Sequence, residues 1–147
     1  MQKIQNLEQK KGGKNGINPT EAQEQAALFE WIRIAAKKYP ELELCHSVPN
    51  GGSRNPIEAR HLKEQGVKPG IPDLFLPCAR GGWHGLYIEM KRRKGGRVSI
   101  EQKKTIIALR EQGFRVEVCE GWEKAREVIK EYMEGENGKL PHCGNAG

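Results

Sequence analysis

Two short apolar runs joined by a glycine-rich turn constrain the fold of this chain most strongly. DLFLPC at 73–78 and GLYIEMK at 85–91 each have the length of a strand, and ARGGWH between them is typical of a hairpin connection. Side chains alternate between the two faces of a strand. The apolar residues of the second run therefore share one face, which we expect to pack on a core, while Glu89 and Lys91 project together from the other face.

The charged residues of this hairpin are the first candidates for a functional site. Asp73 begins the partner strand, so its carboxylate can lie beside that of Glu89. Two close carboxylates repel each other and raise a pKa unless a cation lies between them, and Mg²⁺ or Mn²⁺ accepts such oxygen ligands, to which the backbone carbonyl of Met90 could be added. Lys91 could then orient or deprotonate an attacking water, or stabilise transition-state charge. The alternative is a surface salt bridge between Glu89 and Lys91, with Asp73 as a turn residue after Pro72.

The remaining sequence alternates between helical and strand patterns and predicts an α/β domain, in the order α-β-α-β-β-α-β-α, with a central mixed sheet flanked by helices. Thr20 and Ser99 are the expected N-caps of two helices, and Gly66 is expected to close a third. Ile100, Ile106, Ile107 and Leu109 are expected on one face of the helix that follows Ser99. Besides the hairpin, the predicted elements are helices at 20–39, 57–66, 99–113 and 121–133 and strands at 42–48 and 114–120.

The length of 147 residues fits one domain. We expect a flexible basic arm at 1–18, a single domain at 19–133 and a disordered tail at 134–147. The net charge of +6 is compatible with a polyanionic partner such as DNA. No apolar run approaches the roughly 20 residues of a membrane helix, and the N-terminus has no apolar signal-peptide core, so we expect a cytoplasmic protein without membrane contact.

The four cysteines form no C-x-x-C pair, and three of them lie in apolar runs, which predicts buried, reduced thiols. A zinc site formed by Cys45-His46 and His142-Cys143 is the alternative, although its ligands are adjacent in sequence where zinc sites usually space them two to four residues apart.

Two loops carry the residue types that bind phosphates. In PNGGSRNP, glycines allow backbone amides to approach a phosphate closely and polar side chains add donors; a plain turn is the alternative. In KRRKGGR, the cations follow Lys91 directly and would place positive charge where a DNA backbone must pass; a solvated basic loop is the alternative. The candidate DNA-binding residues are Asn50, Gly51, Gly52, Arg54, Arg92, Arg93, Lys94 and Arg97. No recognition helix is evident, which favours recognition of DNA shape. His46 is a further candidate for substrate contact, against a histidine that is simply hydrogen-bonded in its strand.

Pro72-Asp73 followed by Glu89-Met90-Lys91 has the form of the PD-(D/E)xK nuclease motif. The chain resembles the VRR-NUC group, the virus-type replication and repair nucleases, over 21–133. The segments that carry this resemblance are VPNGGSR, EARHLKEQGVKPGIPDLFLP, GGWHGLYIEMKR and SIEQKKTIIALREQGFRVEVCEGWEKAREVI.

This resemblance implies a restriction-endonuclease-like core and an Mg²⁺- or Mn²⁺-dependent endodeoxyribonuclease. The segments are most similar to the stand-alone viral or phage type, and the resemblance implies that such members pair as homodimers and cut branched DNA such as four-way (Holliday) junctions. If the protein is viral, the expected compartment is the cytoplasm of a bacterial host. Flap, nicking or restriction-like cleavage is a second hypothesis, and a non-catalytic basic DNA-binding module is a third.

The resemblance also implies roles for residues outside the hairpin. The family pattern has a glutamate and a glutamine on the first helix and a glutamine on the helix after the E-x-K strand, which here are Glu21, Gln25 and Gln102. Glu21 would join Asp73 and Glu89 at the metal and take part in catalysis together with Gln102. Glu24 is the rival of Glu21 for the acidic role, and compensation of the helix dipole is the alternative for both. Gln102 also completes an S-x-x-Q capping box with Ser99, a role that can coexist with one in the site.

Overall fold

The computed structural model describes residues 18–50 and 55–135, which form a mixed four-stranded sheet with helices on both faces. β1 pairs with β2 and β2 with β3 in antiparallel orientation, whereas β3 and β4 are parallel. The sheet order follows the sequence, as β1-β2-β3-β4. The strands are β1 (His46–Ser47), β2 (Leu74–Leu76), β3 (Leu86–Lys91) and β4 (Arg115–Glu120). The predicted α/β architecture and the hairpin at its centre are confirmed.

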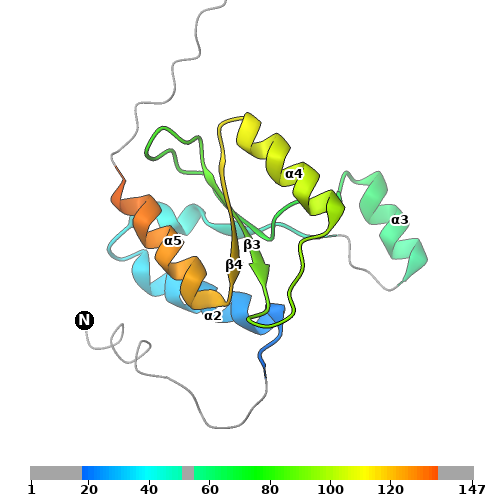
Figure 1. The fold of residues 1–147 in the computed structure, drawn as a ribbon, viewed down its shortest axis with the longest axis horizontal. Helices are drawn as coiled ribbons and strands as arrows, with labels where there is room; N and C mark the ends of the chain where they lie inside the picture. Colours follow the sequence, from blue (N-terminus) through cyan, green and yellow to red (C-terminus); the bar gives the residue numbers. More distant parts are fainter. Residues whose placement is uncertain (1–17, 51–54, 136–147) are drawn as a thin grey trace, which may run out of the picture.

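Helices α2 and α5 lie side by side on one face of β3 and β4, and α4 lies on the other face (Figure 1). Within 18–50 and 55–135, none of these helices is both long enough and apolar enough to cross a membrane. The helical elements are α2 (Glu21–Ala35), the 3-10 helix η1 (Pro40–Leu44), α3 (Pro56–Glu64), α4 (Ile100–Glu111) and α5 (Trp122–Glu134). The predicted arm and tail lie almost entirely outside the described residues.

The expected helix ends are present. Thr20 caps α2, and the side chain of Gln23 bonds back to the Thr20 amide to complete a capping box. Ser99 and Gln102 make the same reciprocal pair at the start of α4. At the end of α3, Gly66 has a φ of 92°, a left-handed conformation that glycine adopts without steric cost. Local sequence therefore fixes where these three helices stop or start.

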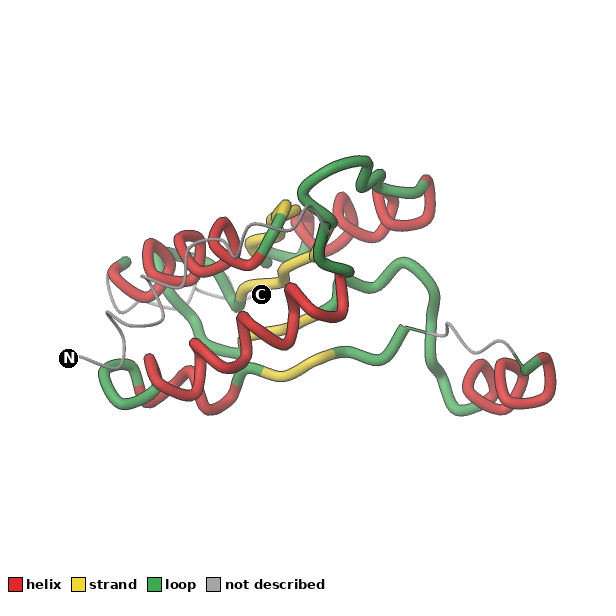
Figure 2. Tube along the Cα trace, turned by 90° about the horizontal axis from the view of Figure 1, so that it is seen from below, coloured by secondary structure: helices red, strands yellow, loops and turns green. Residues whose placement is uncertain are grey.

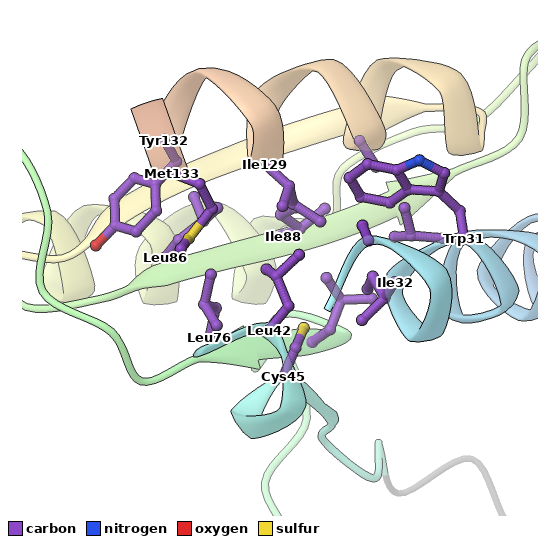
Figure 3. Packing of buried hydrophobic residues seen from close by; sticks show 14 of the residues in the cluster. Trp31, Ile32, Leu42, Cys45, Leu76, Leu86, Ile88, Ile129, Tyr132 and Met133 are labelled. Carbon is purple, nitrogen blue, oxygen red and sulfur yellow. The ribbon is translucent and has the colours of Figure 1, made fainter. Parts of the chain in front are cut away.

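One continuous core lies between the sheet and the helix pair α2 and α5 (Figure 3). The apolar face predicted for β3 is its centre, since Leu86, Ile88 and Met90 are all buried. Ile129 of α5 and Trp31 of α2 pack toward Ile88 from above and from the side. This packing holds one face of β3 rigidly against the helices and leaves its other face for the charged residues.

The predicted strand at 42–48 is wrong for most of its length. Residues Pro40–Leu44 form a 3-10 helix, and only His46–Ser47 pair with β2. The alternation of leucine and glutamate imitates a strand, but Pro40 presets a helical φ at the first position of the turn, and the Leu42 amide bonds back to the Tyr39 carbonyl. Leu42 is thereby buried in the core, whereas Leu44 remains exposed.

The apolar face predicted for the helix after Ser99 is also wrong. Of its residues only Ile106 is buried, whereas Ile100 and Ile107 are 68% and 57% exposed. Successive residues of an α-helix are separated by about 100°, so Ile106 and Ile107 cannot share a narrow face, while Ile100 and Ile107, seven apart, do. Ile106 packs against the sheet, and the other two isoleucines are exposed to solvent.

The prediction of buried thiols is confirmed for the three described cysteines. Cys45, Cys78 and Cys119 are free and buried, and desolvation raises the pKa of Cys45 and of Cys119 to about 12. His142 and Cys143, the other half of the zinc alternative, lie outside the described residues.

Helix α3 projects from the body of the molecule in both views (Figures 1 and 2). No residue of α3 is buried. The segment at 65–72 that follows α3 leads back to the sheet at Asp73, so α3 is attached next to the charged face of the hairpin.

Candidate active site

Asp73 and Glu89 come together as the hairpin predicts. Leu74 pairs with Ile88, so one further step in the antiparallel register sets Asp73 opposite Glu89 on the same face. The Asp73 carboxylate accepts two hydrogen bonds, from the Met90 amide to Oδ2 at 2.7 Å and from Asn50 Nδ2 to Oδ1 at 3.1 Å. One bond comes from β3 and the other from the segment after β1, which fixes the orientation of this carboxylate.

Glu89 lies in the sheet with its side chain only 2% exposed. Its Oε1 accepts from Lys91 Nζ at 2.8 Å and from Gln102 Nε2 at 2.5 Å. Its Oε2 is buried and has no hydrogen-bond partner in the described structure. Lys91 is 7% exposed, so the surface salt bridge on a solvated face does not describe this pair. A buried carboxylate oxygen without a partner is costly unless another ligand satisfies it.

Gln102 combines the two roles that the sequence allowed. Its backbone amide donates to Ser99 Oγ, and its Oε1 accepts from the Ser99 amide at 2.9 Å, which completes the helix cap. The other end of the same amide group, Nε2, donates to Glu89. The N-terminus of α4 is thereby tied to the site through one side chain.

The two glutamates of α2 have different surroundings. The exposed Glu21 lies near enough to the site for its charge to raise the pKa of both Asp73 and Glu89. Glu24 has other partners: it is 1% exposed, pairs with Arg93 and accepts from the Trp122 amide. This placement favours Glu21 for the acidic role, although Glu21 and the pair do not form a cluster of three metal-binding side chains, and residues 18–50 and 55–135 contain no such cluster of His, Cys, Asp or Glu.

Both carboxylates are harder to ionise than usual. Burial raises the pKa of Asp73, against the opposing influence of the Met90 amide and Lys91. Burial likewise raises the pKa of Glu89, and the charges of Asp73 and Glu21 add to the rise, which the bond from Lys91 only partly offsets. The fold thus holds negative charges together in a partly desolvated place.

These shifts predict a stability that depends on pH in the absence of metal. A raised folded-state pKa means that the native protein takes up protons before the unfolded chain does, as the pH falls from 7 toward the ordinary values of 3.8 and 4.5. Asp73→Asn should therefore be more stable than wild type at pH 7 in EDTA, and this difference should narrow as the pH falls. Thermal unfolding across this range measures it, with Glu30→Gln, an exposed change on α2, as control. A difference that widens on acidification would contradict the shifts.

The residues present fit a divalent cation. Asp73 and Glu89 supply hard oxygen ligands, and the carbonyl of Met90, which lies between Glu89 and Lys91 on β3, could add another. Oε2 of Glu89, which has no partner among the described residues, has the chemistry of an unused ligand. A bound Mg²⁺ or Mn²⁺ would relieve the repulsion, polarise a phosphodiester and favour ionisation of a nearby water.

The predicted phosphate-binding residues have different outcomes. Asn50 donates its amide to Asp73 and so orients a carboxylate, a role that the sequence did not indicate. Gly51, Gly52 and Arg54 lie outside the described residues. Arg92, Lys94 and Arg97 lie on the loop after β3, and their contact with DNA stays a prediction. The guanidinium of Arg93 forms ion pairs with Glu24 and Glu123, at 2.6 Å each. These ion pairs compete with the predicted contact between Arg93 and DNA.

His46 and an aromatic cluster lie on the same sheet face as Asp73. Nδ1 of His46 is 2.9 Å from the Leu44 carbonyl, which accepts its proton, and the ring lies edge-on to Phe75. Phe75 stacks on Tyr87 with ring centroids 4.3 Å apart, and Phe114 meets both rings edge-on. The sequence analysis missed this cluster, although the alternation of β3 places Tyr87 on the face of Glu89.

Comparisons with known proteins agree with this site. The sequence profile of the VRR-NUC domain matches residues 20–123, a span that includes Asp73, Glu89 and Lys91. A solved structure described as a VRR_NUC domain protein is 30% identical, with a TM-score of 0.66 over 80% of this chain and 90% of the other. No curated protein matches the sequence.

Proposed function

Because the chain belongs to the VRR-NUC family and carries a nuclease domain of the PD-(D/E)xK type, we propose that it is an Mg²⁺- or Mn²⁺-dependent endonuclease. In this proposal it acts as a homodimer and cuts branched DNA, above all four-way junctions. The observation that supports catalysis most directly is the pair Asp73 and buried Glu89, with Lys91 Nζ at 2.8 Å from Glu89. One oxygen of Glu89 has no hydrogen-bond partner among the residues that the structure describes. This arrangement provides two anionic oxygens and a cationic proton donor on one rigid strand pair.

Each residue has a role in this proposal. Asp73 and Glu89 hold the cation together with the Met90 carbonyl, and Glu21 adds negative charge from α2. Lys91 orients the attacking water or stabilises the charge that develops on the phosphate. Gln102 fixes the carboxylate of Glu89, and Asn50 fixes that of Asp73. Precise orientation of this kind is what metal ligands require from their hydrogen-bond partners.

A non-catalytic DNA-binding module accounts less well for the same residues. DNA binding requires cations that face solvent, and it gains nothing from like charges buried beside each other. The cost of keeping Asp73 and Glu89 ionised would be removed by an apolar or amide residue at either position. Retention of both carboxylates, with Lys91 and Gln102 bound to one of them, therefore favours catalysis.

The loop after β3 should supply DNA affinity. Replacing Arg92, Lys94 and Arg97 by glutamine should weaken binding to every DNA sequence, because side chains that bind phosphates read no bases. The slope of log affinity against log salt concentration should become shallower by roughly 0.9 for each phosphate that the loop no longer neutralises. Fluorescence anisotropy across a salt series in EDTA measures both. An unchanged slope would show that the loop points away from DNA.

The proposed substrate and assembly are tested together. Light scattering should return about twice the 16.6 kDa of the chain, because paired cuts across a junction need two sites related by symmetry. A synthetic four-way junction should be cut on opposing strands, and faster than a linear duplex of equal length, in Mg²⁺ or Mn²⁺ but not in EDTA. Flap and nicked substrates in the same panel test the second hypothesis. A monomeric mass, or equal cutting of the linear duplex, would remove the junction specificity and leave a general endonuclease.

A further inference from the structure

We propose that Glu24 and Arg93 form a clamp that positions the C-terminal end of β3, and with it Lys91, against the first turn of α2, so that Arg93 is a positioning residue and does not bind DNA. The inference rests on the proposed nuclease function. It concerns a buried charge that the site itself does not use.

Glu24 is a buried carboxylate whose two oxygens both have partners. Arg93 Nε donates to its Oε1 at 2.6 Å and Arg93 Nη2 to its Oε2 at 3.3 Å, a forked arrangement in which the guanidinium meets both oxygens. The amide of Trp122 donates to the same Oε2 at 2.9 Å. Trp122 is the first residue of α5, whose N-cap Gly121 has no side chain to offer, so Glu24 of α2 caps α5 from a distance of 98 residues in sequence.

Arg93 connects this cap to the catalytic strand. It follows Lys91 by two residues, and its second carboxylate partner is Glu123 in the first turn of α5. Hydrogen bonds to Glu24 and Glu123 raise the pKa of Arg93 above the already high value of a guanidinium, so Arg93 carries its positive charge throughout the physiological pH range. A single side chain therefore joins three segments: the end of β3, the start of α2 and the start of α5.

Glycines on both sides allow this close packing. Gly121 has a φ of 84°, and a Cβ there would come within 3.2 Å of Arg93 Cγ, so the arginine lies directly over this glycine. The Gly121 amide in turn donates to the Lys91 carbonyl at 3.0 Å. On the other side, a Cβ on Gly96 would come within 2.9 Å of Lys91 Cβ. The backbone at Lys91 is thus held by the same segment that holds Arg93.

The clamp also sets the position of Glu21. Glu21 and Glu24 are three residues apart and lie within the first turns of α2, so a shift of Glu24 relative to Arg93 carries Glu21 with it. Glu21 lies close enough to Asp73 and Glu89 to influence the pKa of each. The geometry therefore divides the two glutamates: Glu24 fixes the helix, and Glu21 presents its charge to the site.

Variants of the full chain test the clamp. Arg93→Lys keeps the charge but removes the fork, and Glu24→Gln keeps the shape but removes the charge. Arg115→Lys is the matched control, because Arg115 also joins two carboxylates, Glu117 and Glu131, at the opposite end of β3 and β4.

Two further variants compare neighbouring arginines as DNA-binding residues. Arg92→Gln and Arg93→Gln each remove one positive charge from the same loop. Of the two, only Arg93 pairs with carboxylates of the residues that the structure describes. For every variant, circular dichroism establishes the folded fraction. Single-turnover cleavage, with enzyme in saturating excess over DNA, and DNA affinity across a salt series in EDTA are then measured.

Arg93→Lys and Glu24→Gln should each lower the single-turnover rate by roughly ten- to a hundredfold, a range typical of small misplacements and of weakened support around a metal site. Their DNA affinity and salt slope should equal those of wild type, and Arg115→Lys should keep the wild-type rate. Arg92→Gln should make the salt slope shallower by roughly 0.9, whereas Arg93→Gln should leave it unchanged. Hydrogen exchange of the Gly121 and Trp122 amides should become faster in Arg93→Lys than in Arg115→Lys.

Either of two results would overturn the clamp. In the first, Arg93→Gln makes the salt slope as shallow as Arg92→Gln does, and Glu24→Gln cuts at the wild-type rate. In the second, Arg115→Lys lowers the cleavage rate as much as Arg93→Lys does. If wild type cuts no DNA in Mg²⁺ or Mn²⁺, the proposed function fails, and the clamp is then decided by exchange alone. Unchanged exchange at Gly121 and Trp122 in Arg93→Lys would overturn it, and faster exchange would support it. The two failures are therefore distinguishable.

Discussion

Asp73→Asn should reduce DNA cleavage by roughly a thousandfold or more, since a bound divalent cation contributes several kcal/mol of transition-state stabilisation and about 4 kcal/mol corresponds to this factor. Asparagine keeps the size of the side chain and an oxygen for the Met90 amide, whose bond to Asp73 is 2.7 Å. It removes the anionic charge that a cation requires. Single-turnover cleavage of a junction in Mg²⁺, measured with enzyme in excess, gives the rate directly.

DNA affinity should change little in the same variant, because we expect binding to depend on the cations of the loop after β3. Anisotropy in EDTA separates binding from catalysis. Glu30→Gln, an exposed change on the helix of Glu21, is the control for removal of one negative charge and should cut at the wild-type rate. Cleavage by purified Asp73→Asn at the wild-type rate would show that the carboxylate pair is not the metal site.

The inactive variant should also be the more stable one in EDTA at pH 7. The same burial that raises the pKa of Asp73 destabilises its ionised form in the folded state. The site thus resembles other functional sites, where local charge repulsion is retained although a neutral residue would stabilise the fold. Loss of activity with a gain in stability would separate a functional role of Asp73 from a structural one.

The part of this site that follows from short-range pattern was predictable from sequence. Alternation along β3 places Glu89 and Lys91 on one face, and the hairpin turn brings Asp73 opposite Glu89. The pair Ser99 and Gln102 is three residues apart, so the capping box is visible as a motif. Each of these inferences needs only strand periodicity, a turn or a helix end.

The hydrogen bonds that orient the site join residues far apart in sequence, and no local pattern reveals them. Asn50 reaches Asp73 across 23 residues, and Arg93 reaches Glu24 across 69. Sequence analysis interpreted both Asn50 and Arg93 as phosphate-binding residues, because an amide or a guanidinium in a polar loop has that meaning when its partner is unknown. Only the packing of α2 and α5 on the sheet shows which polar groups are already satisfied.

The 3-10 helix at Pro40–Leu44 is a different kind of failure. There the local signals conflict: the alternation of leucine and glutamate favours a strand, whereas Pro40 favours a helical turn. The conflict is resolved by burial, since the turn places Leu42 in the core and shortens β1 to two residues. A short β1 leaves His46 at the sheet edge, on the face of the aromatic cluster.

Lys91→Met should lower the cleavage rate by roughly 10²- to 10⁴-fold, the usual contribution of a positioned proton donor or acceptor. Methionine retains much of the length and apolar volume of the lysine stem, so the packing against Gly96 should persist. DNA affinity should remain near the wild-type value, because the Lys91 ammonium is buried against Glu89. Lys91→Arg should not rescue the rate, since a guanidinium is larger than an ammonium and cannot be deprotonated, and the Lys91 side chain is only 9% exposed.

The same change should raise the pKa of Glu89, because the bond from Lys91 is the largest influence that lowers it. Lys91→Met should therefore be less stable than wild type in EDTA at pH 7, where a buried carboxylate would keep only the bond from Gln102. Lys91→Met/Glu89→Gln should recover stability, since it removes the unpaired charge, but it should not recover cleavage. Thermal unfolding and single-turnover rates of both variants separate the two effects. Wild-type cleavage by Lys91→Met would show that the ammonium acts only as a structural counter-ion of Glu89, and the chemistry would then depend on the carboxylate pair alone.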